Sequence, residues 1–184
     1  MTMDKKKRKR KRASPLGALY SLMGTFFAAI FLFLAAFLFM GRFAVVDGDS
    51  MLPTLKDGDR IYISTSFYKP GYADVIGIGR ASEDVSMIKR VIALPGDVVD
   101  INFQSHLITV NNRVITETYR VADAISVEGD IPFPLKVPED AVFVLGDNRN
   151  DSLDSRFSSV GCIRLGEIAG KAVWRISPEP GPIR

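Results

Sequence analysis

Cysteine and histidine are almost absent from this chain, which limits the chemistry that it can use. Among 184 residues there is one cysteine, Cys162, and one histidine, His106. A lone cysteine excludes an intrachain disulfide, and a lone histidine offers no plausible Ser–His–Asp partner set. We interpret Cys162 as a small buried apolar residue and His106 as a surface residue or one whose hydrogen bonds are satisfied. No cofactor and no metal ion are expected.

The positive charge of the chain is concentrated near its N-terminus. Residues 5–12 are eight consecutive Lys and Arg residues, and the whole chain has a net charge of +3. Without residues 1–12, 16 Lys and Arg stand against 20 Asp and Glu, a net charge of about −4. A mildly acidic body argues against nucleic-acid binding. The basic run is then a solvated tail, an RNA-binding arm or a topology signal.

A long apolar run follows the basic residues. Residues 16–40, LGALYSLMGTFFAAIFLFLAAFLFM, are 25 residues without charge or proline, and about 20 such residues span a bilayer as a helix. A signal peptide has a shorter apolar core of about 7–15 residues, followed by small residues, whereas this run ends in Phe39 and Met40. We therefore predict an uncleaved transmembrane helix over 16–41, a basic cytoplasmic tail over 1–15 and an extracytoplasmic domain over 42–184.

Short apolar segments separated by turns predict a mostly β domain of coiled antiparallel sheets, or a barrel, after the helix. Asn111 and Asn112 are expected in a tight hairpin turn, because Asn tolerates positive φ. We expect residues 120–138 to be a loop or a mobile insertion, and the final SPEPGPIR to be a frayed tail. The expected strands are 43–46, 60–64, 74–78, 85–93, 98–102, 107–110, 113–116, 141–145 and 171–176.

The first of three polar stretches, residues 45–59, reads VVDGDSMLPTLKDGD. Gly48 permits a tight bend before Ser50, and Pro53 fixes the chain beyond it. A serine on such a bend is either an ordinary turn residue or a nucleophile presented to a cleft.

The second stretch, residues 87–97, reads MIKRVIALPGD and offers a base for such a serine. In a strand, Lys89 shares its face with Met87 and Val91. Apolar neighbours remove hydration from an ammonium and lower its pKa, so that a neutral amine becomes available to accept a proton. Arg90 lies on the opposite face, where it can reach solvent or a carboxylate. The alternative is that Lys89 is a surface lysine whose stem covers apolar residues.

The third stretch, residues 145–157, reads LGDNRNDSLDSRF and is densely charged around Ser152. An EF-hand calcium loop is excluded, because Arg149 stands at its third position and neither the sixth nor the twelfth residue fits. A network of carboxylates and guanidiniums beside a cleft fits better, with Ser152 placed to hydrogen-bond a buried lysine; a polar turn is the alternative. The charged residues are Asp147, Arg149, Asp151, Asp154 and Arg156.

In this order, and directly after an apolar helix, the three stretches resemble the motifs of the type I signal peptidase family. SMLPTL resembles the nucleophile motif, KRVIALPGD the base motif and GDNRNDSLDSR the third motif. The resemblance covers residues 16–176. A lysine in the second motif, rather than a histidine, is similar to the bacterial and organellar branch of the family.

The resemblance assigns roles to individual residues. It implies that Ser50 is the nucleophile, Lys89 the general base and Ser152 the residue that orients the lysine. The Ser50 N–H would be one oxyanion donor. Salt bridges and hydrogen bonds from four charged residues would support the site: Asp147, Arg149, Asp154 and Arg156.

Two positions depart from the family pattern. Some members have a hydroxyl side chain two residues before the nucleophile, where this chain has Gly48, so a backbone group or water must replace that oxyanion donor. In YADVIGI, Ala73 stands where the family usually has glycine, which affects the local turn and not the chemistry.

The resemblance implies a membrane-bound serine endopeptidase that removes signal peptides from secretory preproteins after small residues at −1 and −3. Met51 and Phe43 are expected to reach the membrane interface. Expected partners are preproteins, the lipid bilayer and the protein translocation channel, and no nucleic acid. The alternatives are a specialised peptidase for one pilin or conjugation protein and a catalytically dead membrane-anchored binding protein. A self-cleaving repressor-type protease would need a soluble DNA-binding segment in place of the apolar helix.

Overall fold

The computed structural model describes residues 15–39, 41–65, 68–79, 85–119 and 124–183. The chain divides into two compact units, Met1–Phe39 and Met40–Arg184. The basic run at residues 5–12 lies outside the described residues, so its cytoplasmic placement stays a prediction, as do the domain limits at residues 15 and 41.

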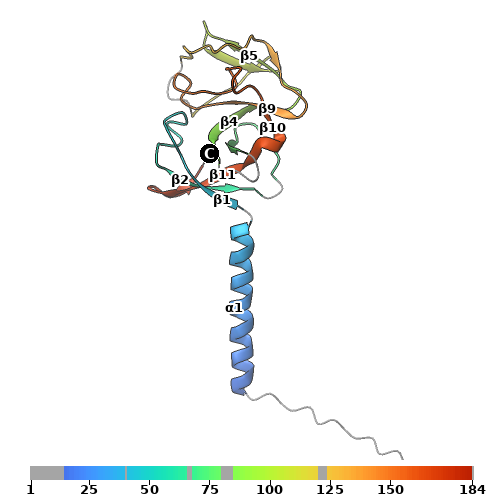
Figure 1. Ribbon diagram of the computed structural model, residues 1–184, viewed down its shortest axis with the longest axis vertical. Helices are drawn as coiled ribbons and strands as arrows, with labels where there is room; N and C mark the ends of the chain where they lie inside the picture. The colour runs from blue at the N-terminus through green and yellow to red at the C-terminus, as the bar shows by residue number, and fades with distance from the viewer. Residues whose placement is uncertain (1–14, 40, 66–67, 80–84, 120–123, 184) are drawn as a thin grey trace, which may run out of the picture. The chain divides into compact units, whose positions relative to one another are not determined.

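The described part of the first unit is a single helix, α1 (Pro15–Phe39) (Figure 1). Proline suits the first position of a helix because its missing N–H would have no partner there, and the Ala, Leu and Met residues that follow favour helix. The segment Pro15–Ala35 is long and apolar enough to cross a membrane, and none of it is buried in protein. A helix that is apolar on every side needs an apolar solvent, so α1 is a candidate membrane span.

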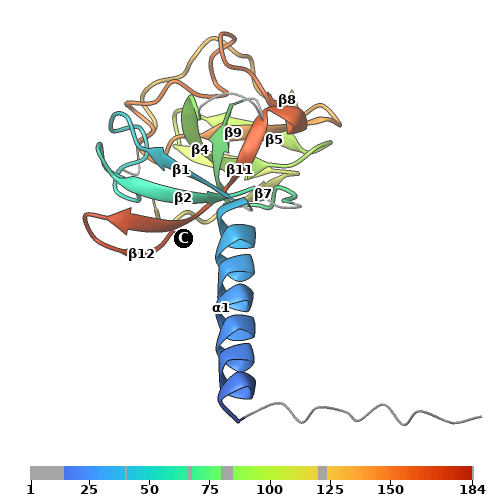
Figure 2. The ribbon, with the colours of Figure 1, turned by 60° about the horizontal axis from the view of Figure 1, so that its bottom comes forward.

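The second unit is built on a curled antiparallel sheet of eight strands (Figures 1 and 2). The strand order is β1-β2-β11-β3-β4-β9-β10, with β12 paired to β11. Because β11 pairs with β2 on one side and β3 on the other, the end of the chain closes the sheet between two early strands. The strands are β1 (Gly41–Val45), β2 (Arg60–Ser64), β3 (Val75–Ile78), β4 (Met87–Ala93), β9 (Ala141–Leu145), β10 (Ile163–Arg164), β11 (Ile168–Ser177) and β12 (Gly181–Pro182).

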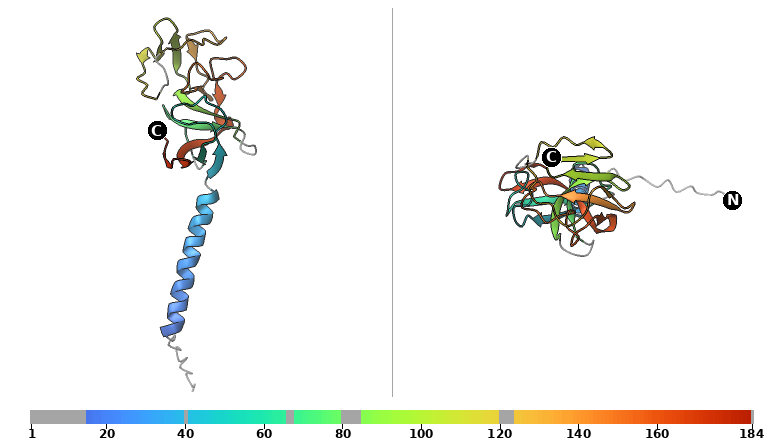
Figure 3. Two further views of the ribbon diagram at one scale, coloured as in Figure 1. Left: turned by 90° about the vertical axis from the view of Figure 1, so that its left-hand side faces the viewer. Right: turned by 90° about the horizontal axis from the view of Figure 1, so that it is seen from above.

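A smaller sheet carries the hairpin at Asn111 and Asn112 (Figure 3). Both asparagines have positive φ, 52° and 62°, as a tight primed turn requires. The strand order in this sheet is β7-β6-β5-β8. Its strands are β5 (Val98–Asn102), β6 (Leu107–Val110), β7 (Arg113–Val114) and β8 (Leu135–Lys136), and a short 3₁₀ helix, η1 (Leu165–Glu167), precedes β11.

Buried apolar side chains anchor the turn that contains Ser50. Met51 and Leu55 are 1% and 0% exposed and pack with Ile61 and Ile63 of β2 and with Ile88 of β4. Burying apolar groups of this size is worth about 1.5–3 kcal/mol for each side chain. The turn is therefore fixed on the sheet by the residues that flank Ser50.

The mostly β fold is confirmed, and four predicted strands match β2, β5, β6 and β9 residue for residue. The segment predicted as a strand at 113–116 is shorter, ending at Val114, whereas β11 is longer than its prediction at 171–176. Strands β8, β10 and β12 were not predicted.

Of two predictions about irregular segments, one is wrong and one is wrong in part. Gly181–Pro182 pairs with Trp174 and Arg175 of β11, so the C-terminal segment is not a frayed tail. The segment 120–138 was predicted to be a loop or a mobile insertion, and its described part is a loop apart from β8. Ile125 and Val137 are 1% and 0% exposed and belong to a core cluster, so this loop is packed in place and is not a mobile insertion. Residues 120–123 lie outside the described residues.

Candidate active site

Three segments far apart in the sequence meet beside β4. Ser50 lies in the turn after β1, Lys89 lies in the middle of β4, and Ser152 lies in the loop after β9. β4 pairs with β9, with Arg90 opposite Leu145, which brings the loop after β9 to this place. The loop is joined to the turn by the N–H of Asn148, which donates to the Ser50 carbonyl at 3.0 Å.

A tight turn presents Ser50. Gly48 has φ of +78°, a left-handed conformation that favours glycine, and its N–H donates to Oδ1 of Asp57 at 2.9 Å. The N–H of Leu52 donates to the Asp49 carbonyl at 3.1 Å. Ser50 itself is half-buried, so part of the residue remains exposed at the surface.

Lys89 reaches this hydroxyl. Its Nζ lies 2.7 Å from Oγ of Ser50, within hydrogen-bond distance. Lys89 is 4% exposed, and burial lowers its pKa below the ordinary value of 10.5. Asp154 acts in the opposite direction on this pKa and Arg156 acts in the same direction as burial. A neutral amine at this distance can accept the serine proton.

Buried ion pairs surround these two residues. Arg90 donates through Nε and Nη2 to the two carboxylate oxygens of Asp147, at 2.7 and 2.6 Å. Arg156 binds both oxygens of Asp154 in the same way, at 2.8 and 2.9 Å. All four side chains are fully buried. Bidentate pairs of this kind hold their groups in a fixed geometry, so Arg90 reaches a carboxylate and not solvent.

Arg149 forms a further pair with a residue that the sequence analysis did not single out, Glu117. Its Nη1 lies 2.9 Å from Oε2 of Glu117, and its Nε donates to the Gly146 carbonyl at 2.8 Å. Thr54 was missed too, although its Oγ1 lies 2.5 Å from Oδ2 of Asp147. Thr54 stands within the quoted SMLPTL string, so the sequence contained a signal for it, whereas nothing in the sequence marks Glu117 as a partner of Arg149.

Ser152 is brought to the site but does not bond Lys89 here. Its Oγ is buried and makes no hydrogen bond within the described part of the chain. It packs against Gly146: a Cβ on that residue would lie 2.3 Å from Oγ of Ser152 and 2.5 Å from the Ser50 carbonyl oxygen. Ser152 therefore lies beside Ser50, and its role in orienting the lysine stays a prediction.

The turn at Ala73 is maintained despite the missing glycine. Ala73 has φ of +64°, a conformation that glycine adopts more readily. Its carbonyl accepts a hydrogen bond from Nη1 of Arg90 at 2.7 Å, and its N–H donates to the Val91 carbonyl at 2.9 Å. These bonds hold the turn against β4, next to Lys89.

His106 and Cys162, which were not predicted to take part in catalysis, lie outside the candidate site. Nδ1 of His106 accepts a hydrogen bond from the N–H of Ile125 at 3.2 Å, as predicted for a satisfied residue. Cys162 is half-buried against the core of the smaller sheet, and burial raises the pKa of its thiol. Across the described ranges, His, Cys, Asp and Glu form no group of three able to hold a metal ion.

A small cavity of about 40 Å³ opens beside Ser50. It is lined by residues 45–47, where β1 ends, by Ser50 and Met51 of the turn, and by residues 85–88, where β4 begins. A larger hollow of about 510 Å³ near Tyr72 contains none of the predicted site residues. The space next to the serine is thus small, and the polar residues Asp47 and Ser86 line it together with the apolar ones.

One edge of β4 is open next to this cavity. β3 pairs with β4 from Met87 to Arg90, whereas β9 pairs with it only from Arg90 onward. In the described residues, the stretch from Met87 to Lys89 therefore has a strand on one side only. Such an edge can add an extended peptide by main-chain hydrogen bonds.

The sequence from residue 19 to residue 177 matches the family described as signal peptidase, peptidase S26. The chain belongs to this signal peptidase family. Signal peptidase I of Bacillus licheniformis is 35% identical over 157 residues, 80% of this chain and 81% of the relative. Signal peptidase I of Bacillus caldolyticus is 31% identical over 190 residues, 96% of each chain.

A crystal structure of a signal peptidase I from Enterococcus faecalis V583 is 26% identical, with a TM-score of 0.45, and covers 59% of this chain and all of that one. Membership of the S26 signal peptidases makes this chain a serine endopeptidase that acts in signal-peptide removal. The predicted enzyme class is therefore confirmed.

Proposed function

We propose that this signal peptidase cleaves secretory preproteins after small residues at −1 and −3, with Ser50 as nucleophile and Lys89 as general base. The observation that carries the proposal is the 2.7 Å separation between Oγ of Ser50 and Nζ of a lysine that is 4% exposed. A serine needs such a base, because its hydroxyl is a weak nucleophile.

In the proposed reaction, the Ser50 oxygen attacks the scissile carbonyl carbon while Lys89 takes the hydroxyl proton. The Ser50 N–H donates one hydrogen bond to the oxyanion, and a backbone group or water replaces the side-chain donor that Gly48 lacks. Lys89 then gives its proton to the leaving amine, and the bond to the mature protein breaks. Water activated by the neutral lysine hydrolyses the acyl-enzyme and releases the signal peptide.

Substrate recognition has two parts. We propose that the extended segment before the cleavage site pairs with the open edge of β4 at Met87–Lys89. The cavity of about 40 Å³ beside Ser50 then receives the small side chains. Val85, Met87 and Ile88 line it from the β4 side, so large side chains are excluded sterically.

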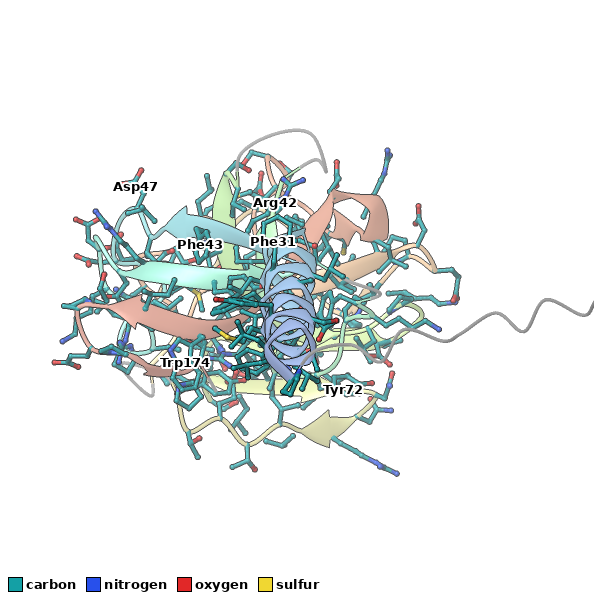
Figure 4. All side chains as sticks on the ribbon, turned by 90° about the horizontal axis from the view of Figure 1, so that it is seen from below. Phe31, Arg42, Phe43, Asp47, Tyr72 and Trp174 are labelled. Atoms are coloured by element: carbon teal, nitrogen blue, oxygen red, sulfur yellow. The ribbon has the colours of Figure 1, made fainter. Side chains whose placement is uncertain are left out.

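The membrane arrangement is also a proposal. α1 spans the bilayer with the basic tail in the cytoplasm and the β domain on the opposite face, as the positive-inside rule favours. Phe43 of β1 and Trp174 of β11 are 61% and 46% exposed and suit contact with the lipid interface (Figure 4). Met51, which was predicted to accompany Phe43, is 1% exposed, so that prediction is wrong. The translocation channel remains a proposed partner that delivers the preprotein.

The test uses the full-length protein in lipid or detergent with a preprotein that carries an Ala-x-Ala site. Ser50→Ala and Lys89→Ala should each abolish cleavage, because removal of either member of a dyad removes the reacting oxygen or its base. The matched controls are Ser105→Ala and Lys136→Ala, two exposed positions outside the site, which should cleave like the parent. Mass spectrometry maps the cut, and thermal melting shows that each variant is folded.

The outcomes separate the candidate functions. Cleavage directly after Ala-x-Ala that depends on both residues supports the proposal. Cleavage that persists in Lys89→Ala shows that the dyad is wrong. A folded parent that cuts no general preprotein is instead either a peptidase for one pilin or conjugation substrate or a dead binding protein, and a panel of such substrates distinguishes these two.

A further inference from the structure

The hydroxyl of Thr54 is inserted into the buried ion pair between Arg90 and Asp147. Its Oγ1 lies 2.5 Å from Oδ2 of Asp147 and 3.1 Å from Nη2 of Arg90. A carboxylate accepts hydrogen bonds and a guanidinium only donates them, so the direction of both bonds is fixed. Thr54 donates its one hydroxyl proton to Asp147 and accepts a hydrogen bond from Arg90.

These two bonds join the three segments that build the site. Thr54 belongs to the turn that carries Ser50, and Arg90 directly follows Lys89 on β4. Asp147 directly precedes Asn148, whose N–H holds the Ser50 carbonyl at 3.0 Å. The Thr54 hydroxyl therefore links the turn that carries Ser50 to β4, which carries Lys89, and to the loop after β9.

The turn transmits the position of Thr54 to Ser50. The N–H of Leu55 donates to the Met51 carbonyl at 2.9 Å, and both of these side chains are buried. Together with the bond from the Leu52 N–H to the Asp49 carbonyl, this ties residues 49–55 into one hydrogen-bonded unit. The separation between Oγ of Ser50 and Nζ of Lys89 depends on how this unit is held against β4.

We propose that Thr54 is a positioning residue for the Ser50–Lys89 pair, acting through Arg90 and Asp147 without touching the substrate. This inference rests on the proposed dyad. Loss of the hydroxyl leaves Oδ2 of Asp147 without one of its donors and frees the turn to shift relative to β4. A misplacement of reacting groups by about 1 Å lowers a rate by roughly 100-fold.

The experiment compares Thr54→Val, which keeps the shape and removes the hydroxyl, with Thr54→Ser, which keeps the hydroxyl. Full-length variants in detergent are assayed on an Ala-x-Ala peptide. Thr54→Val should lower kcat by roughly 10- to 100-fold with KM unchanged, and Thr54→Ser should stay close to the parent. Thr109→Val, at a half-buried threonine on β6, is the matched control and should change neither constant.

Two further measurements distinguish positioning from stability alone. In Thr54→Val, Asp147 still pairs with Arg90, so the acid limb of the pH–rate profile should keep its place while the plateau falls. Melting temperatures show whether the valine variant is folded, and Thr54→Ala replaces it if it is not.

The proposal is overturned if Thr54→Val melts earlier yet keeps the parental kcat, or if Thr54→Ser loses as much activity as Thr54→Val. Failure of the proposed dyad gives a different result, because Ser50→Ala would then still cleave whatever stands at position 54.

Discussion

Among single residues, Lys89 is the one whose protonation governs the reactivity of Ser50 in the proposed dyad. Burial is the largest influence on its pKa and lowers it. Asp154 raises this pKa and Arg156 lowers it, and the two are bonded to each other through both carboxylate oxygens. Asp147 and Asp151 also raise this pKa, but desolvation is the largest influence and decides the direction.

We expect kcat/KM to rise with pH until Lys89 has lost its proton and then to level off. In the proposed dyad the neutral amine is the base, and its pKa lies below 10.5, so activity is lost as the pH falls through that lowered value. The pH–rate profile of the parent enzyme on an Ala-x-Ala peptide measures this limb.

The control for this profile is Lys136→Ala, which removes an exposed lysine and should leave the limb unchanged. A profile that stays flat down to about pH 4, where ordinary carboxyl groups titrate, contradicts a lysine base.

At the scale of strands and loops, periodicity decided what could be predicted. β2, β5, β6 and β9 were found because four or five residues with apolar alternation or an apolar run carry a strand signal. β8, β10 and β12 have two residues each, too few for any period. The short strand β12 exists because β11 offers it an edge, which is a tertiary cause.

The site was predictable in its members but not in its pairings. The motif strings placed Ser50 and Lys89 together, and their 2.7 Å separation agrees with that expectation. The partner of Arg149 is Glu117, 32 residues away along the chain, and only the path of the intervening segment brings them together. The absence of a bond between Ser152 and Lys89 likewise depends on side-chain orientations that no motif encodes.

The loop after β9 gives a prediction at this scale. Gly146→Ala should abolish most cleavage, because the new Cβ would lie 2.5 Å from the Ser50 carbonyl oxygen and 2.3 Å from Oγ of Ser152. The turn must shift, at a cost of about 1–3 kcal/mol of stability, and Ser50 shifts with it. Cleavage rate and the urea midpoint of unfolding measure the two effects.

Gly166→Ala is the matched control, since a Cβ there meets nothing within 4 Å. It should cleave and unfold like the parent. Parental activity in Gly146→Ala would show that the loop and the turn yield without disturbing Ser50.

On the scale of the whole molecule, the chain joins an apolar helix to a domain with its own core. The β unit contains three clusters of buried apolar side chains in its described part, whereas the described side chains of α1 are almost all exposed. In the proposed membrane arrangement, the two units therefore depend on different solvents, water for the β unit and lipid for α1.

This division predicts that residues 41–184 fold without α1. The truncated protein should cut a soluble Ala-x-Ala peptide at the parental rate, because Ser50, Lys89 and the buried ion pairs beside them all lie in the β unit. On a preprotein embedded in vesicles it should be at least ~10-fold slower, since it loses the high local concentration that a shared membrane provides. Fluorescence of Trp174, the one tryptophan of the chain, monitors folding in both proteins. Equal rates on embedded substrate, or an unfolded truncation, would contradict this view of the units.

The small cavity beside Ser50 has a consequence for how errors are avoided. Main-chain pairing along β4 does not depend on side-chain identity, so many extended segments can dock there. In the proposed mode of substrate recognition, the space of about 40 Å³ then acts as a steric sieve, which keeps the carbonyl of a bulky residue away from Ser50. Rejection on this basis occurs after docking, and bulky sequences are released uncut. Selectivity between small and bulky residues then lies in kcat. Chains that dock but cannot be cleaved compete briefly with true substrates for the edge of β4.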